Sequence, residues 1–144
     1  MAYLETFLHD VTERLSAAGL TVEPEYPQNA RPVPAKGLFV TAAVSAVRHE
    51  PPLAFSGGSA VPVQLTLRLR FHCGTDRDAA QLSVCWELTV LPVLLGMGLA
   101  VQSAAFGETV YDRTLDRFVR EAQVQIAGAV TRTPLPDSQT EVTA

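Results

Sequence analysis

Residues 61–72 alternate strictly between apolar and polar side chains, and this pattern limits what the chain can fold into. Five apolar residues occupy every second position and polar residues fill the positions between them: Val63, Leu65, Leu67, Leu69 and Phe71 against Gln64, Thr66, Arg68, Arg70 and His72. A β-strand with one buried face and one solvated face shows this alternation. Because two arginines share the solvated face, a second sheet packed over it is disfavoured. The segment predicts a strand in a sheet that helices cover on one side.

The length and composition predict one domain with more apolar surface than it needs. A chain of 144 residues buries enough surface for a core without disulfides or metals. Hydrophobic residues make up 47% of it and charged residues 18%, so we expect a partner to cover part of its surface. We assign the domain to residues 1–131. Residues 132–144 are polar, contain Pro134 and Pro136, and predict a disordered tail.

The charge and the cysteines exclude several classes of protein. The net charge is −4, and Lys36 is the single lysine, so no broad basic surface for nucleic acid is expected. Cys73 and Cys85 have no CxxC spacing, which favours reduced thiols in a cytoplasmic protein over a metal site. The most apolar stretch, residues 88–101, is interrupted by Pro92 and is too short to cross a membrane. The start of the chain lacks the pattern of a secretion signal.

Two helices are predicted. Residues 2–18 carry apolar side chains at helical spacing, and Gly19 follows where a left-handed C-terminal cap belongs. A second helix begins at Thr75 or Asp76, either of which can cap it, and Pro92 should bend or break it. Its second half is apolar on nearly all sides, because a second stripe runs beside the one that fits the core: Val84, Leu88, Leu91 and Leu95. Such a helix either lies in the centre of the core or forms a subunit interface.

Further strands are predicted on both sides of residues 61–72. Residues 38–48 form one, and residues 99–112 and 118–131 form a final pair joined by a polar turn at 113–117. Arg120 falls on the apolar side of the last strand, so we expect a bulge or a strand start near Val119. The order helix, strand, strand, helix, strand, strand predicts an α+β fold, with one mostly antiparallel sheet packed on one face by two helices.

Two connecting segments are predicted to be irregular. Residues 21–37 contain four prolines and indicate an extended connection, with a short edge strand at 20–23. Residues 49–60 are too long for a tight turn and predict a protruding loop that carries Leu53 and Phe55. Residues 53–59 and 21–37 are expected to be mobile in the free subunit and ordered in the assembly, because their backbone has few possible ladder partners.

No catalytic, cofactor or metal site is predicted. His49 and His72 lack a His or Glu partner at metal-ligand spacing, His9 has only glutamates at that spacing, and adjacent His72 and Cys73 point to opposite faces of a strand. The glycine-rich residues 56–59 lack the lysine and the helix start of a phosphate-binding loop.

Two groups of charges remain open to more than one interpretation. Glu108, Asp112 and Asp116 could hold a cation, but Arg113 and Arg117 lie among them and favour a solvated, salt-bridged turn. Arg68 and Arg70 form either a solvated strand face or a charged surface that meets an acidic partner or lines a ring.

The order of the elements resembles the tail terminator family of bacteriophages and phage-like contractile particles. The resemblance covers about residues 2–130 and rests on an N-terminal helix, two strands, a helix start and a terminal hairpin: YLETFLHDVTERLSAAG, GLFVTAAVSA, VQLTLRLRFHC, DRDAAQLSVCWEL and ETVYDRTLDRFVREAQVQIAGAV. The length of the apolar stretch 88–99 departs from the family pattern and puts the subunit packing in question.

The resemblance implies a non-enzymatic protein that forms a hexameric ring, caps the tail tube and docks the neck. Its partners would be copies of itself and the tube, sheath and neck proteins. It would be cytoplasmic during assembly and then part of the particle tail. The candidate interface residues are Leu53, Phe55, Arg68, Arg70, Leu88, Leu91, Leu95, Arg113 and Arg117. Two alternatives remain: another tail or neck completion protein, and a small α+β ligand-binding or hydrolytic enzyme, which would need a pocket with convergent titratable groups.

Overall fold

Seven strands form one sheet in the computed structural model, which describes residues 3–24, 37–51, 53–55 and 58–132. The strands are β1 (Val22–Pro24), β2 (Leu38–His49), β3 (Leu53–Phe55), β4 (Gly58–Gly74), β5 (Ala100–Phe106), β6 (Val110–Asp112) and β7 (Arg117–Arg132). The order across the sheet is β1-β2-β4-β7-β5, with β3 beside β4 and β6 beside β7. All neighbours are antiparallel except β1 and β2. The predicted α+β class with a mostly antiparallel sheet is confirmed.

Strand β4 is the centre of the sheet, as its alternating pattern predicted. It pairs with β7 from Ser59 to Gly74, and with β2 from Val63 to Cys73 along its other edge. Six of its apolar side chains are 0–2% exposed and form the middle of the core: Val63, Leu65, Leu67, Leu69, Phe71 and Cys73. The strand is longer than the pattern indicated, because it continues past both ends of residues 61–72.

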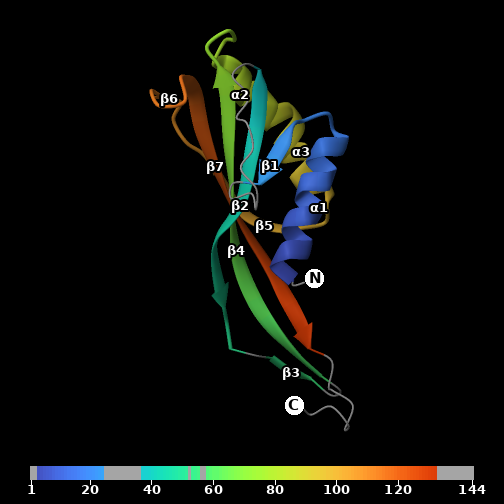
Figure 1. Ribbon diagram of the computed structural model, residues 1–144. Coiled ribbons are helices and arrows are strands. Elements are labelled where there is room, and N and C mark those ends of the chain that lie inside the picture. Colours follow the sequence, from blue (N-terminus) through green and yellow to red (C-terminus); the bar gives the residue numbers. More distant parts are fainter. Residues whose placement is uncertain (1–2, 25–36, 52, 56–57, 133–144) are drawn as a thin grey trace.

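The helices lie on one face of this sheet (Figure 1). Helix α1 (Tyr3–Ala17) packs beside β1 and β2 through Phe7, Val11 and Leu15. It ends as predicted at Gly19, whose φ of 96° is accessible to glycine at little cost. The amide of Leu20 donates to the carbonyl of Leu15 at 3.2 Å and closes the turn.

The second helix runs through three segments: α2 (Ala80–Cys85), the π-helical η1 (Trp86–Val90) and α3 (Leu91–Gly96). The predicted caps Thr75 and Asp76 are wrong, because the helix starts later and the carboxylate of Asp78 accepts the amide of Ala80 at 2.9 Å. The wide π turn lies immediately before Pro92. A proline lacks an N–H and crowds the carbonyl four residues earlier, so a wider turn relieves the strain without ending the helix.

Of the two features expected near Val119, the strand start is confirmed, because β7 begins at Arg117, and the bulge is absent. Phe71 faces Arg120 and His72 faces Val119 in an unbroken register. Arg120 stays on the helix side because its guanidinium lies 3.9 Å from the ring centroid of Phe106 and its Nη1 donates to Ser83 Oγ at 2.8 Å. The register shifts instead in β2 between Val44 and Ala46, and in β5 between Val101 and Ser103.

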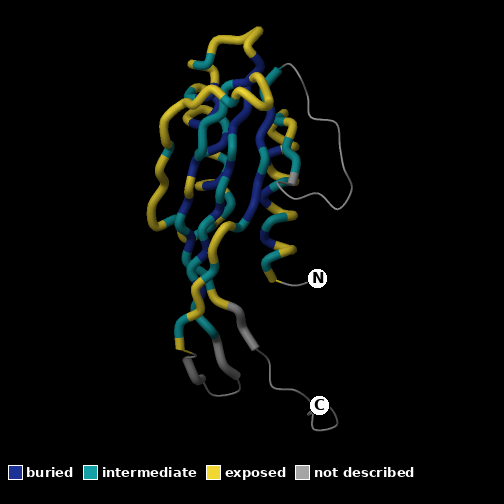
Figure 2. The backbone as a smooth tube through the Cα atoms, turned by 60° about the vertical axis from the view of Figure 1, so that its left-hand side comes forward, coloured by how far each residue is buried: buried dark blue, intermediate teal, exposed yellow. Residues whose placement is uncertain are grey.

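Residues 49–60 are not a simple loop. Strand β3 pairs with β4 through Leu53 opposite Ala60 and Phe55 opposite Gly58, so the prediction of a segment with few ladder partners is wrong for 53–55. The short edge strand expected near residues 20–23 is present as β1. Beyond the helices, β4 and β7 continue as an arm with little buried surface (Figure 2).

Residues 25–36 and 133–144 lie outside the described residues, so the prediction of a disordered tail at 132–144 can be compared with the structure only at Arg132. That residue is the last one of β7. Across the described part of the chain, no helix is both long enough and apolar enough to span a membrane.

Candidate functional site

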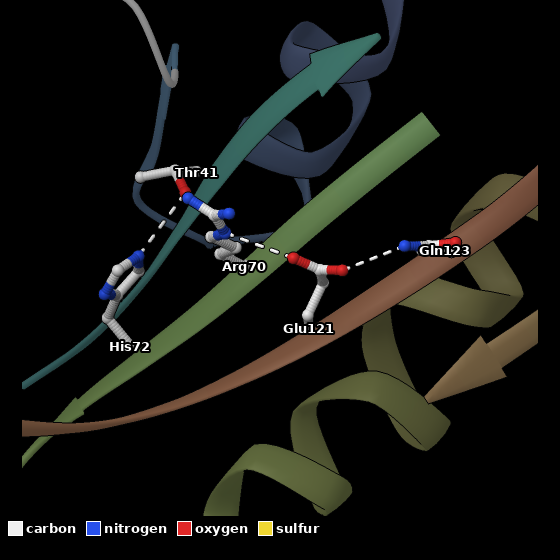
Figure 3. A network of polar contacts seen from close by, with 5 residues as sticks. All are labelled: Thr41, Arg70, His72, Glu121 and Gln123. Atoms are coloured by element: carbon white, nitrogen blue, oxygen red, sulfur yellow. Dashed lines mark hydrogen bonds and ion pairs between the residues drawn. The ribbon is translucent and has the colours of Figure 1, made fainter. Parts of the chain in front are cut away.

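The sheet face opposite the helices carries a hydrogen-bonded polar network, which we call the open face (Figure 3). The register places Arg70 of β4 opposite Glu121 of β7, and their side chains pair with Nε and Oε1 3.2 Å apart. Gln123 Nε2 donates to the other carboxylate oxygen at 2.9 Å. Thr66 Oγ1 donates to Gln125 Oε1 at 3.0 Å in the same way. The polar parity predicted for Arg68 and Arg70 is confirmed.

The electrostatics of the open face keep Glu121 ionised. The hydrogen bond from Gln123 lowers the pKa of its carboxyl most. Desolvation is the next largest effect and raises the pKa, and the hydrogen bond and charge of Arg70 and the charge of Arg68 then lower it, so that the net shift is downward. Two arginines thus act on one carboxylate on a half-buried surface. Such a surface suits polar contact with another protein, and the described residues contain no group of His, Cys, Asp and Glu that could hold a metal ion.

At one end of the open face, side chains from β2, β4 and β7 pack against one another. His72 and Phe39 stack, His72 Nε2 hydrogen-bonds with Thr41 Oγ1 at 3.4 Å, and the Arg117 guanidinium lies 5.2 Å from the Phe39 centroid. His72 is 7% exposed, so it is a structural histidine, and Cys73 next to it points into the core on the other face. Burial raises the pKa of the Cys73 thiol.

The position of Arg117 corrects the interpretation of the 113–117 turn. Arg117 is only 4% exposed, and its Nε donates to the carbonyl of Leu115 at 3.3 Å. Gly74 stands opposite Arg117 in the register, between the strand that carries Arg117 and the strand that carries Phe39. Arg113 is exposed as predicted. Within the described part of the chain neither arginine forms an ion pair, so the prediction of a salt-bridged turn is wrong. Because Arg117 is buried, it is also not the exposed interface charge that was predicted.

The acidic residues of this turn bind groups of the turn itself. Asp112 Oδ1 accepts the amide of Leu115 at 3.0 Å, and Asp116 accepts the hydroxyl of Tyr111. That hydrogen bond raises the pKa of Tyr111. Asp116 has a φ of 53°, a conformation that aspartate tolerates in tight turns. The carboxylates therefore order the turn, and Tyr111 is held at the surface.

A row of apolar side chains lies on the outer side of the second helix. Leu88 is 73% exposed and Leu95 57%, whereas Leu91 is half-buried against the core. Val84, which belongs to the same predicted stripe but was not among the candidates, is 53% exposed. Leu53 and Phe55 are in β3, but their side chains lie outside the described residues. We call Val84, Leu88 and Leu95 the helix stripe.

Two hollows flank helix α1. The first, about 510 Å³, lies between the α1–β1 turn and α2 and is lined by Leu20, Thr21, Leu38, Arg77, Val84 and Cys85, among others. The second, about 340 Å³, lies between α1 and the end of α3 and is lined by Phe7, Asp10, Glu13, Arg14, Met97 and Leu99. Neither hollow gathers a nucleophile with a base and an orienting acid. Sequence reasoning missed both, because each forms between segments distant in the chain.

The chain matches no known protein-family model. It also matches no curated protein.

Proposed function

We propose that this chain is a structural assembly protein of the tail terminator type, which forms a ring with copies of itself and caps a phage or phage-like tail tube. The proposal rests on the resemblance in element order and on the surfaces described above. It makes the chain a non-enzymatic component that is cytoplasmic during assembly and part of a particle afterwards.

The observation that carries the proposal is the helix stripe. An exposed leucine forgoes roughly 1.5–3 kcal/mol relative to a buried one, and contiguous exposed apolar residues on a helix mark an interaction surface. Val84, Leu88 and Leu95 follow one another along a single helix whose opposite side already fills the core. An assembly protein that meets copies of itself or a tail partner accounts for such a stripe.

The open face supplies the second surface that an assembly protein of this kind needs. It is polar and half-buried, and Arg68 and Arg70 give it positive charge around Glu121. Charge of this kind sets the orientation and the rate of docking more than the stability of the fold. We infer that this face meets an acidic tail or neck protein or lines the ring.

The first experiment measures the mass of the purified chain by light scattering across a range of concentrations. A closed oligomer, six copies according to the resemblance, is the expected result. Leu88→Lys with Leu95→Lys should weaken self-association or attachment to tails, and Glu87→Lys, an exposed change on the same helix, should not. A chain that stays monomeric even with purified tail tubes would overturn the proposal.

The second experiment asks about the biological role. Deleting the gene from a host that produces the particle should leave tails of abnormal length or tails that do not join heads, and the wild-type chain should restore them. Normal particles without the gene would instead favour a protein unrelated to tails. Restored tails without any effect on length would favour a different tail or neck component.

A further inference from the structure

Two surfaces that expose apolar side chains lie at opposite lateral ends of the sheet. At one end, the β6–β7 turn exposes Tyr111 (46%) and Leu115 (37%); we call this the turn surface. At the other end, the 510 Å³ hollow between the α1–β1 turn and α2 is lined by Leu20, Leu38 and Val84; we call this the α1–α2 pocket. In Figure 1, β6 is at the left of the sheet and α1 is at the right.

The register shows that these two surfaces are level along the strand direction. Leu38 of β2 faces Cys73 of β4, Cys73 faces Phe118 of β7, and Phe118 faces Tyr111 of β6. Leu38 and Tyr111 are therefore the two ends of one row across the sheet. An operator that carries the turn surface of one copy onto the pocket of another needs little translation along the strands. With a rotation that is a whole fraction of a turn, repeating such an operator closes a ring, whereas a large translation would produce an open helical filament.

Tyr111 on the turn surface is held in place before any contact forms. Tyr111 packs edge-on against Phe118, with ring centroids 5.8 Å apart, and its hydroxyl donates to Asp116. A tyrosine held in this way loses little conformational freedom on binding, and tyrosine anchors are frequent among the residues that dominate interface energies. The pocket is an open hollow of about 510 Å³ whose lining mixes apolar side chains with polar ones, as a phenol side chain requires.

The charges at the two surfaces are complementary. Asp112 and Asp116 lie beside Tyr111 on the turn surface, and Arg77 lines the pocket, where its Nη1 donates to Gln81 at 3.3 Å. Asp76 and Asp78 flank Arg77 in the sequence but do not line the pocket. The carboxylates of an incoming turn surface thus meet the Arg77 cation in the pocket of the neighbouring copy. The exposed Arg113 of the turn surface would lie near Asp76 and Asp78, which flank Arg77 in that copy.

We propose that the turn surface of one copy docks into the α1–α2 pocket of the next copy, with Tyr111 as the anchor and Arg77 opposite Asp112 and Asp116. The partner is a second copy of this chain, because one chain carries both halves of the contact. The interface is heterologous, so each copy uses one surface toward each neighbour. This inference rests on the proposed ring and names the residues that would close it.

The test uses two classes of variant, each of which damages one surface. Tyr111→Lys, with Leu115→Lys as a second variant, damages the turn surface. Thr21→Trp, with Val84→Lys as a second variant, fills or charges the pocket through side chains that are already exposed. Glu87→Lys serves as the control for a charge change on the same helix, and thermal melting confirms that each variant is folded. Tyr111→Phe keeps the ring of the side chain and should preserve assembly.

Light scattering should show the oligomer for the wild-type chain and monomers for each damaged variant alone. An equal mixture of Tyr111→Lys and Thr21→Trp should then form dimers and nothing larger, because the mixture has one intact contact that cannot be repeated. If the wild-type chain is an oligomer and folded variants of either class keep its mass, the docking inference is overturned while the ring stands. If the variants are monomers but the mixture forms no dimers, the two surfaces do not pair and the inference fails. A wild-type chain that is monomeric under all conditions overturns the ring itself.

Discussion

Phe39 and His72 stand directly opposite each other on β2 and β4, and their rings stack with centroids 4.4 Å apart and planes 4° from parallel. Arg117 from β7 adds its guanidinium over the same phenylalanine. The three side chains lie at the end of the open face that is nearest the turn surface. Their contacts link the shape of the turn to the body of the sheet.

Arg117→Ala should destabilise the fold, whereas Arg113→Ala should not. Arg117 loses a cation–π contact and a hydrogen bond to the Leu115 carbonyl, together about 1–3 kcal/mol of unfolding free energy. Arg113 is exposed and should change stability by less than about 0.5 kcal/mol. Urea unfolding of both variants checks the difference. Equal effects would show that the stack contributes nothing.

The double change Arg68→Ala and Arg70→Ala should leave stability nearly intact and impair attachment to tail or neck. Arg70 and Glu121 pair with side chains 40% and 35% exposed, so the pair contributes about 0–1 kcal/mol, which is at most roughly 4 °C in melting temperature for a domain of this size. The matched control is Gln64→Ala with Thr66→Ala, which removes polar groups of the same strand face without changing its charge. Thermal melting and a particle-assembly assay are the measurements. A large drop in melting temperature would make the arginines structural; normal assembly would place the docking surface elsewhere.

Cys85 should make the protein less stable at alkaline pH. Burial raises the pKa of its thiol to about 11, from an ordinary value of 9.0. Below pH 9 the thiol is protonated in both states and its contribution is complete; between pH 9 and about 11 the unfolded chain loses the proton first, so stability falls as pH rises. We expect the stability advantage of wild type over Cys85→Ala to shrink by about 2 kcal/mol across that window. Urea unfolding at several pH values measures it. A constant difference would contradict the prediction.

Gly19→Ala and Gly96→Ala should have opposite effects. At both positions an added Cβ meets nothing within 4 Å, so the result depends on the backbone alone. Gly19 has a φ of 96°, and alanine there should cost about 1 kcal/mol. Gly96 lies in α3, where alanine should stabilise by about 0.4–1 kcal/mol. Chemical unfolding of the two variants provides the measurement, and destabilisation by Gly96→Ala would point to a need for glycine beyond conformation.

The long helix and the long strands could be predicted because their apolar residues recur with a regular period. Strand β4 has a period of two over many residues, and α1 has an amphipathic period and a glycine at its end. Strands β3 and β6 have three residues each, too few to show a period, and they exist because β4 and β7 extend far enough to pair with them.

The exposed and buried side chains could be predicted only in part, because the burial of a strand residue depends on which residues of the neighbouring strands it faces. The second apolar stripe left the core and a subunit interface open, and the exposure of Leu88 and Leu95 excludes the core for these two residues. Arg117 and Arg120 are exceptions that local patterns cannot reveal: one reaches across a glycine on the neighbouring strand, and the other lies over an aromatic ring on β5. The exposure of Tyr111 follows from the pairing of β6 with β7, and the sequence shows only that an aromatic residue precedes a polar turn.

The central position of β4 has a consequence for synthesis on the ribosome. Gly74 pairs with Arg117 and Ser59 with Arg132, so the longest ladder of the sheet joins strands far apart in the chain. While the chain is being made, β4 emerges with one long edge unpaired and waits for β7, the last strand in chain order. Such delayed pairing slows folding and leaves a strand edge open to other nascent chains. Translation speed after residue 74 and access to chaperones should therefore govern how much of the protein reaches its native form.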